Sequence, residues 1–129
     1  MSDKTYIPEG QDGLPSQIGT TFETLAATIG SRRGAGEGSY TSRLLEGDLG
    51  TLLSKVTEEA GEVVEAARDG EVDHLRYEVG DLLYHTLVVL ERFGIPLDEL
   101  AAELNTRMRE DERPEGAVCL LDEYVKRGK

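Results

Sequence analysis

Two short acidic motifs contain the residues of this chain whose types and spacing could do chemistry. The first contains Glu59 and Glu62, and the second contains Glu78 and Asp81. The two carboxylates of each motif are three residues apart, so on a helix they project from one face. If the two helices pack together, four carboxylates converge and repel one another unless a cation lies between them. Oxygen ligands favour Mg²⁺, with Mn²⁺ as the alternative, and such a cation can organise a phosphate-containing substrate.

Each motif taken alone is more simply explained as a solvated helix surface. Glutamates three residues apart are common on exposed helices, and Lys55 could form an ordinary ion pair with Glu59. Two such pairs on neighbouring helices, both beside apolar stripes, favour a functional site over that explanation. Glu58 stays open at this point, because it could be an outer ligand of the cation or simply solvated.

Hydrophobic periodicity predicts that both motifs lie on long helices. One apolar stripe spans residues 48–69 and centres near Val56 and Ala60, and a second stripe spans residues 73–93. The connection between them is short, so the helices should be antiparallel neighbours with both motifs at similar heights. Glu59 and Glu78 lie at the stripe edges and are therefore expected to be the least exposed of the carboxylates.

The rest of the chain predicts shorter helices and no competing strands. These helices are expected at residues 22–32, at 41–46, from Pro96 onward and at 118–125. Side-chain caps are expected from Thr20 or Thr21 for the first helix and from Asp48 and Asp73 for the two long ones. The predicted fold class is therefore all-α, a helical bundle built on a central antiparallel helix pair.

Length and composition indicate one small domain. A chain of 129 residues suits a single modest core. We expect an irregular arm at residues 1–19, which is rich in Gly and Pro, a helical domain at 20–108 and a C-terminal extension at 109–129. The helix at 73–93 is apolar on more than one side, so we expect dimerisation to complete the bundle.

The charge balance and the cysteine count exclude several classes of function. Lys plus Arg is 14 and Asp plus Glu is 26, and the net charge of -12 argues against nucleic acid as a partner. The longest apolar-rich run, residues 82–90, is too short to span a membrane, and the N-terminus lacks a signal pattern. Cys119 is the only cysteine, which fits a reducing, cytoplasmic setting.

A glycine-rich loop at residues 34–38 leads into Ser39, Tyr40 and Thr41. Backbone N–H groups and hydroxyls of this segment could hold phosphate oxygens, although a flexible linker with a capping threonine explains it more simply. His85 lies in an apolar run and is expected to be a satisfied core or interface histidine. His74, near a helix start, is expected to be solvated.

The two acidic motifs and the segments around them resemble those of a known family. Glu58-Glu-Ala-Gly-Glu62 followed by Glu78-Val-Gly-Asp81 resembles the EExxE…ExxD signature of the all-α, MazG-like nucleotide pyrophosphohydrolases. Within that superfamily, Gly38-Ser-Tyr-Thr41 and Asp81-Leu-Leu-Tyr-His85 are similar to segments of the phosphoribosyl-ATP pyrophosphohydrolases of histidine biosynthesis. The resemblance covers residues 21–108.

This resemblance implies Mg²⁺-dependent hydrolysis of 1-(5-phosphoribosyl)-ATP to 1-(5-phosphoribosyl)-AMP and pyrophosphate. The implied metal ligands are Glu59, Glu62, Glu78 and Asp81, and the implied catalytic residues are Glu58, Glu59 and Glu62. The metal would lower the pKa of an attacking water, which Glu58 would orient. The implied substrate contacts are Arg32, Ser39, Tyr40, Thr41, Arg43 and Lys55. The resemblance also implies a homodimer and brings in the cyclohydrolase of the next step as a candidate partner.

Two other functions remain open on the sequence. The first is a house-cleaning pyrophosphohydrolase of the same superfamily that acts on dNTPs or dUTP. The second is a non-enzymatic helical interaction module, in which the carboxylates form a solvated face.

Overall fold

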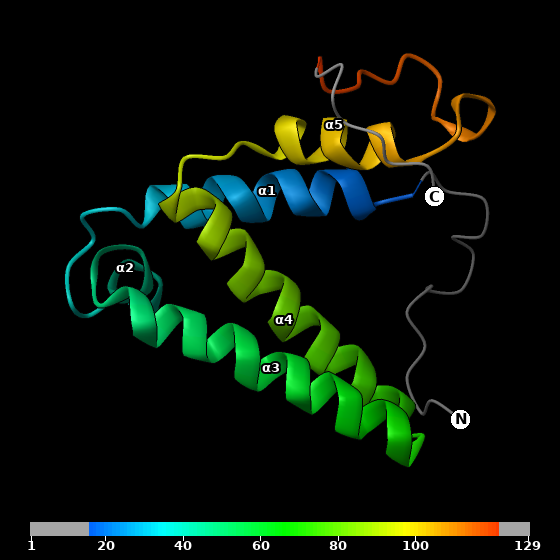
Figure 1. Ribbon diagram of the computed structural model, residues 1–129. Helices are drawn as coiled ribbons and strands as arrows, with labels where there is room; N and C mark the ends of the chain where they lie inside the picture. The colour runs from blue at the N-terminus through cyan, green and yellow to red at the C-terminus, as the bar shows by residue number, and fades with distance from the viewer. Residues whose placement is uncertain (1–15, 122–129) are drawn as a thin grey trace, which may run out of the picture. The chain divides into compact units, whose positions relative to one another are not determined.

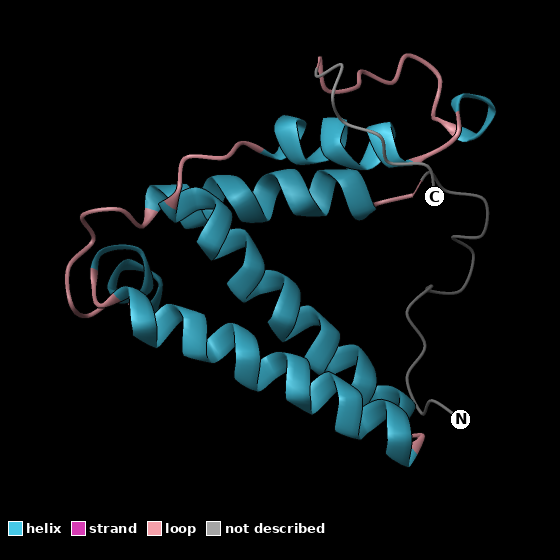
Figure 2. Cartoon of the chain, viewed as in Figure 1, coloured by secondary structure: helices cyan, strands magenta, loops and turns pink. Residues whose placement is uncertain are grey.

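The computed structural model describes residues 16–121, and these residues form helices but no strand (Figures 1 and 2). The helices are α1 (Ile18–Ser31), α2 (Tyr40–Glu46), α3 (Leu49–Asp69), α4 (Val72–Arg92) and α5 (Leu97–Arg107), followed by a short 3₁₀ helix at Glu110–Glu112. The prediction of an all-α fold is confirmed. The chain divides into two compact units, Met1–Phe93 with α1 to α4 and Gly94–Lys129 with α5. None of these helices is both long and apolar enough to cross a membrane.

Helices α3 and α4 form the predicted antiparallel hairpin at the centre of the first unit (Figure 1). Gly70 ends α3 with a φ of 69°, a left-handed conformation that glycine adopts without strain. The N–H of Glu71 then donates to the Ala66 carbonyl at 3.2 Å, and that of Gly70 donates to Ala67 at 3.2 Å. This pair of hydrogen bonds is a Schellman motif, and it turns the chain directly into α4.

The capping predictions were partly wrong. Asp48 caps α3 as predicted, since its carboxylate accepts from the Thr51 N–H at 3.2 Å. Helix α1, however, begins at Ile18 without a side-chain cap, so Thr20 and Thr21 lie inside the helix. Asp73 lies in the first turn of α4 rather than at its N-cap, because the tight turn at Gly70 lets the helix begin earlier.

The predicted terminal segments also differ from the structure. Residues 118–121 are not helical, and the rest of the helix predicted at 118–125 lies outside the described residues. Of the irregular arm predicted at 1–19, residues 1–15 lie outside the described residues, and Ile18 and Gly19 belong to α1.

Helices α1 and α2 lie at the end of the hairpin that is remote from its turn (Figure 1). Arg92, the last residue of α4, donates to the Leu44 carbonyl of α2 at 2.9 Å. Arg33, just after α1, pairs with Glu91 of α4 at 3.1 Å. The buried side chains of Ile29 and Leu44 complete this end of the core.

The buried seam between α3 and α4 does not follow the predicted apolar stripe. On α3 the buried residues are Leu52, Glu59 and Ala66, which recur every seven residues, instead of a stripe centred near Val56 and Ala60. The helix is thus rotated so that a carboxylate, which the stripe placed only at its edge, lies on the seam itself. This rotation leaves several apolar side chains exposed on the two long helices. They are Leu53, Val64, Val72, Tyr77, Val79 and Leu83.

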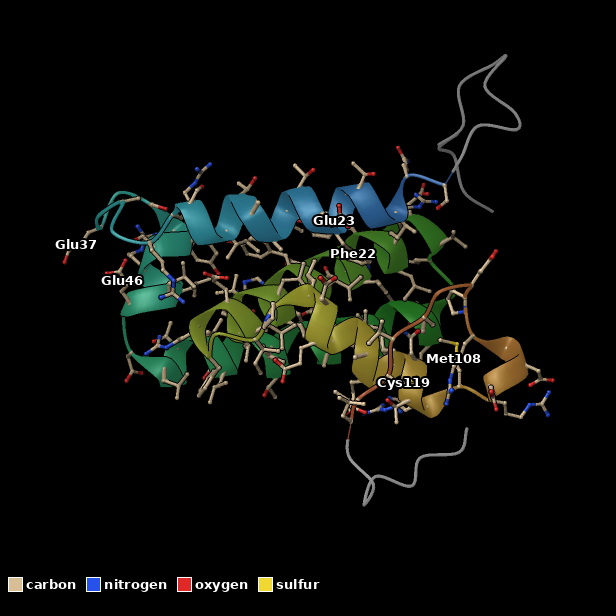
Figure 3. All side chains as sticks on the ribbon, turned by 90° about the horizontal axis from the view of Figure 1, so that it is seen from above. Phe22, Glu23, Glu37, Glu46, Met108 and Cys119 are labelled. Carbon is tan, nitrogen blue, oxygen red and sulfur yellow. The ribbon has the colours of Figure 1, made fainter. Side chains whose placement is uncertain are left out.

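In the second unit, the chain after α5 returns to the helix through side-chain hydrogen bonds. Asn105 donates to the Val118 carbonyl, and the Leu120 N–H donates to the Thr106 hydroxyl, both at 2.9 Å. This unit contains Met108 and the free thiol of Cys119 (Figure 3).

Candidate metal centre

The four carboxylates of the two acidic motifs lie on the α3–α4 hairpin as two facing pairs. Glu59 on α3 lies against Asp81 on α4, and Glu62 lies against Glu78. A step of three residues forward on α3 matches a step of three back on α4, as antiparallel helices require. The sequence predicted that both motifs lie at similar positions along the hairpin axis. In the structure each motif contributes one carboxylate to each of two clusters, which are about 4.5 Å apart along that axis.

The first pair is partly shielded from water and carries unfavourable charge repulsion. Glu59 is only 5% exposed, as the sequence predicted for this position. Burial, together with a hydrogen bond and charge repulsion from Glu59, raises the pKa of Asp81 above its ordinary value. Two carboxylates in contact favour either a proton or a cation between them.

His85 lies beside this first pair, and both of its ring nitrogens are occupied. Its Nδ1 lies 2.8 Å from the Asp81 carbonyl oxygen, so Nδ1–H is the donor there. Its Nε2 then accepts from the Tyr40 hydroxyl at 2.9 Å. His85 is 2% exposed, so the prediction of a satisfied core histidine is confirmed.

The second pair includes a histidine that the sequence reasoning missed. Ligand atoms of Glu62, His74 and Glu78 lie within 4.8 Å of one another. His74 Nε2 is 3.1 Å from Glu78 Oε1, so this histidine is not simply solvated as predicted. The spacing of four residues between His74 and Glu78 on one helix was the signal that could have found this contact.

Lys55 and Glu58 lie beside the first pair. Lys55 Nζ is 3.2 Å from Glu58 Oε2 and 3.5 Å from Glu59 Oε1. The hydrogen bond that Lys55 donates to Glu58 raises the pKa of the lysine, so the ammonium stays charged. Glu58 has a side chain that is 57% exposed, and it belongs to neither cluster.

Of the loop residues predicted to bind phosphate, two reach α4 through their hydroxyls. Tyr40 bonds to His85 as described, and burial raises the pKa of its hydroxyl, which therefore stays protonated. The Thr41 hydroxyl bonds to the Tyr84 hydroxyl. The Ser39 side chain instead caps α2 by accepting from the Ser42 N–H at 3.2 Å.

The structure does not bring the predicted arginines to the carboxylates. Arg32 contacts Ser31 at 3.3 Å. Arg43 donates to the Glu37 carbonyl and lies 5.7 Å from the centre of the Tyr40 ring. It lines a hollow of about 490 Å³ beside α2. The hollow is also lined by the acidic residues Glu37 and Glu46, which are labelled in Figure 3. Tyr40 lines this hollow and also hydrogen-bonds to His85, which lies beside the first pair.

Comparison with known proteins decides the family. The family model for phosphoribosyl-ATP pyrophosphohydrolase matches residues 22–108, a range that includes both acidic motifs. The chain belongs to the phosphoribosyl-ATP pyrophosphohydrolase family. The resemblance that the sequence motifs carried is therefore confirmed.

Curated relatives of this pyrophosphohydrolase family include both short and long proteins. The chain is 42% identical to the phosphoribosyl-ATP pyrophosphatase of Erythrobacter litoralis over 109 residues. These aligned residues make up 84% of this chain and 97% of that protein. Phosphoribosyl-ATP pyrophosphatase 1 of Bradyrhizobium diazoefficiens is 47% identical over 88 residues, or 67% of this chain and 83% of that protein.

The longer relatives are bifunctional. The histidine biosynthesis bifunctional protein HisIE of Halalkalibacterium halodurans is 46% identical over 90 residues, or 69% of this chain and 43% of that protein. The chain spans about half the length of the HisIE relatives that it matches.

The donor set of the seam fits the divalent cation that the family resemblance implies. Carboxylate oxygens predominate in both clusters, and hard dications prefer such ligands. Oε2 of Glu78 is buried and has no hydrogen-bond partner among the described residues. A buried carboxylate oxygen without a partner is unfavourable, and a bound cation satisfies it.

Proposed function

We propose that the protein hydrolyses the α–β phosphate bond of 1-(5-phosphoribosyl)-ATP, releasing 1-(5-phosphoribosyl)-AMP and pyrophosphate. This reaction is the second step of histidine biosynthesis. The observation that carries the proposal is the pair of facing carboxylate clusters within the family match at residues 22–108. The proposed catalytic domain comprises residues 20–108.

In this proposal Glu59, Glu62, Glu78 and Asp81 hold Mg²⁺, with Mn²⁺ as the alternative. When bound, the metal neutralises phosphate charge and lowers the pKa of an attacking water. The buried positions of Glu59 and Glu78 support this role, because a carboxylate shielded from water binds a cation with less competition from solvent.

Residues around the first pair are proposed to orient the attacking water and to contact the phosphate oxygens. Glu58 lies exposed beside Glu59 and is proposed to orient the water, while Lys55 offers a charged ammonium to a phosphate oxygen. Substrate would approach Tyr40 and Thr41, whose hydroxyls lie against α4. The proposed contacts for the distant end of the substrate are Arg32, Ser39 and Arg43.

The proposed setting is the cytoplasm, which the single, unpaired Cys119 supports. The cyclohydrolase of the next step is a proposed partner. This partner is supported by the relatives named as bifunctional histidine biosynthesis proteins, because this chain spans only about half of their length.

A substrate panel tests the proposed reaction. The purified full chain is incubated with Mg²⁺ and either 1-(5-phosphoribosyl)-ATP, dUTP or the four dNTPs, and pyrophosphate release is measured. We expect turnover of phosphoribosyl-ATP that EDTA abolishes. Turnover of dNTPs with none of phosphoribosyl-ATP would assign the house-cleaning activity instead, and no turnover of any substrate would favour an interaction module.

A further inference from the structure

The cluster at Glu62, His74 and Glu78 combines nitrogen and oxygen donors, and its histidine lies outside the EExxE…ExxD pattern. His74 comes from the first turn of α4, and its side chain is 41% exposed, so solvent can deliver an ion to it. Glu78, one turn further along α4, is only 7% exposed. The cluster therefore has an open side at His74 and a shielded floor at Glu78.

The distances within the cluster suit a shared ion. Two ligand atoms bound at right angles to one ion, each about 2.1 Å from it, lie roughly 3 Å apart. His74 Nε2 and Glu78 Oε1 are separated by 3.1 Å. The third ligand atom, from Glu62, lies within 4.8 Å of both. An ion could thus be bound with little movement of either helix.

Glu78, which the proposed function also uses, has a carboxylate oxygen that lacks a partner in the described part of the chain. Its Oε1 is engaged by His74, whereas its Oε2 is buried with no hydrogen-bond partner among the described residues. Most buried polar atoms in proteins are satisfied, so an orphaned carboxylate oxygen points to a cation that completes it.

The other side of the imidazole also resembles a metal-binding arrangement. His74 Nδ1 faces Glu71, whose Oε2 lies 3.7 Å away. Metal-bound histidines usually present their second nitrogen to a carboxylate, which fixes the tautomer and makes the ligating nitrogen more basic. His85 offers no such free nitrogen, since both of its ring atoms are occupied by Asp81 and Tyr40.

We propose that Glu62, His74 and Glu78 form a second cation position, next to that of Glu59 and Asp81, which takes a transition-metal dication in preference to Mg²⁺. Imidazole nitrogen is a good ligand for later first-row dications, whereas Mg²⁺ favours oxygen and holds its waters. The proposal shares Glu62 and Glu78 with the proposed function and rests on it to that extent. His74 gives this position its selectivity.

Binding of Co²⁺ and of Mg²⁺ to the substrate-free full chain tests the proposal. Isothermal titration calorimetry gives both affinities, and proton NMR detects the strongly shifted ring N–H of a histidine bound to Co²⁺. We expect the wild-type chain to bind Co²⁺ more tightly than Mg²⁺ and to show the shifted resonance. His74→Gln should remove that resonance and weaken Co²⁺ binding at least about tenfold, with Mg²⁺ affinity changed less than about twofold.

Glu65→Gln is the matched control, because it removes one charge from an exposed position of α3 that belongs to neither cluster. It should leave the resonance and the preference for Co²⁺ unchanged, and circular dichroism checks that both variants remain helical. The proposal is overturned if the wild-type chain shows no shifted resonance, if the resonance persists in His74→Gln, or if the two affinities fall together. Since no substrate is present, these outcomes are independent of whether phosphoribosyl-ATP is hydrolysed.

Discussion

At the scale of single residues, carboxylates from α3 and α4 lie against each other in the seam between these helices. Glu59 and Asp81 are in contact, and the raised pKa of Asp81 reflects both burial and the neighbouring charge. Lys55 offsets part of this repulsion from one side. Such an arrangement is unfavourable for the empty fold and favourable for a bound dication, which supports the proposed metal site.

Conservative replacement of either member of this pair should abolish most of the activity. Glu59→Gln and Asp81→Asn keep the shape but remove a charge from the proposed metal site. Residues that merely orient metal ligands account for about 10–100-fold in affinity or activity, so loss of a ligand should reduce Mg²⁺-dependent turnover by at least that factor. Steady-state kinetics measures this fall in turnover, and titration with Mg²⁺ measures the loss of metal affinity. Normal turnover in both variants, with helical content kept, would remove these residues from the site.

At the scale of elements, α2 is fastened to α4 by hydroxyl groups beside the carboxylates. Tyr40 donates to the buried His85, and Thr41 pairs with Tyr84. The sequence indicated this loop through its glycines and hydroxyls and through the family resemblance of Gly38-Ser-Tyr-Thr41. The contact couples the proposed substrate loop to the helix that carries Glu78 and Asp81.

Tyr40→Phe should destabilise the fold, because it leaves the Nε2 acceptor of buried His85 without its donor. The expected loss in the free energy of unfolding is about 1–3 kcal/mol, measured by urea denaturation. Tyr77→Phe on α4 is the control, since that ring is 68% exposed and the change should stay within about 0.5 kcal/mol. Equal effects of the two changes would contradict the proposed importance of the Tyr40 hydroxyl.

The hairpin turn depends on one glycine. Gly70 has a φ of 69°, so Gly70→Ala should destabilise the fold by about 1 kcal/mol. Gly61→Ala is the opposite case, because a Cβ there would meet nothing within 4 Å and the residue lies in the middle of α3. That change should stabilise the fold by about 0.5–1 kcal/mol. Thermal unfolding of the two variants should move in opposite directions, and movement in the same direction would refute this account of the turn.

At the scale of the whole molecule, the two long helices expose apolar side chains that the rotated seam does not cover. Leu53 and Val64 on α3, with Val79 and Leu83 on α4, are exposed. Exposed apolar side chains on neighbouring helices are candidates for an interaction surface. A second copy of the chain is the partner we propose for it, as the excess of apolar residues on α4 had already indicated.

The full chain should therefore behave as a homodimer, with twice the monomer mass of 14.1 kDa. Light scattering after size exclusion measures this mass at micromolar concentration. Leu83→Asp should shift the chain to a monomer, because it buries a charge in the proposed interface. Ser54→Asp, at an exposed polar position of α3, should leave the dimer intact. A wild-type monomer under these conditions would refute the proposed interface.

The sequence by itself determined the two long helices, because their signals are local. Apolar periodicity, the Asp48 cap and Gly70 each act within one or two turns, and they located α3 to within a residue. The positions of Glu59 and Glu78 at the edges of the apolar stripes likewise identified them as the shielded carboxylates, which the structure confirms.

Only the tertiary structure decided how these elements meet. The pairing of Glu59 with Asp81 depends on the rotation of α3, which apolar periodicity misjudged because part of that stripe faces away from α4. The contact of Tyr40 with His85 joins residues 45 positions apart. The meeting of His74 and Glu78 on α4 with Glu62 on α3 depends on how the two helices pack. Rotation and register between helices are properties of packing, and no local pattern specifies them.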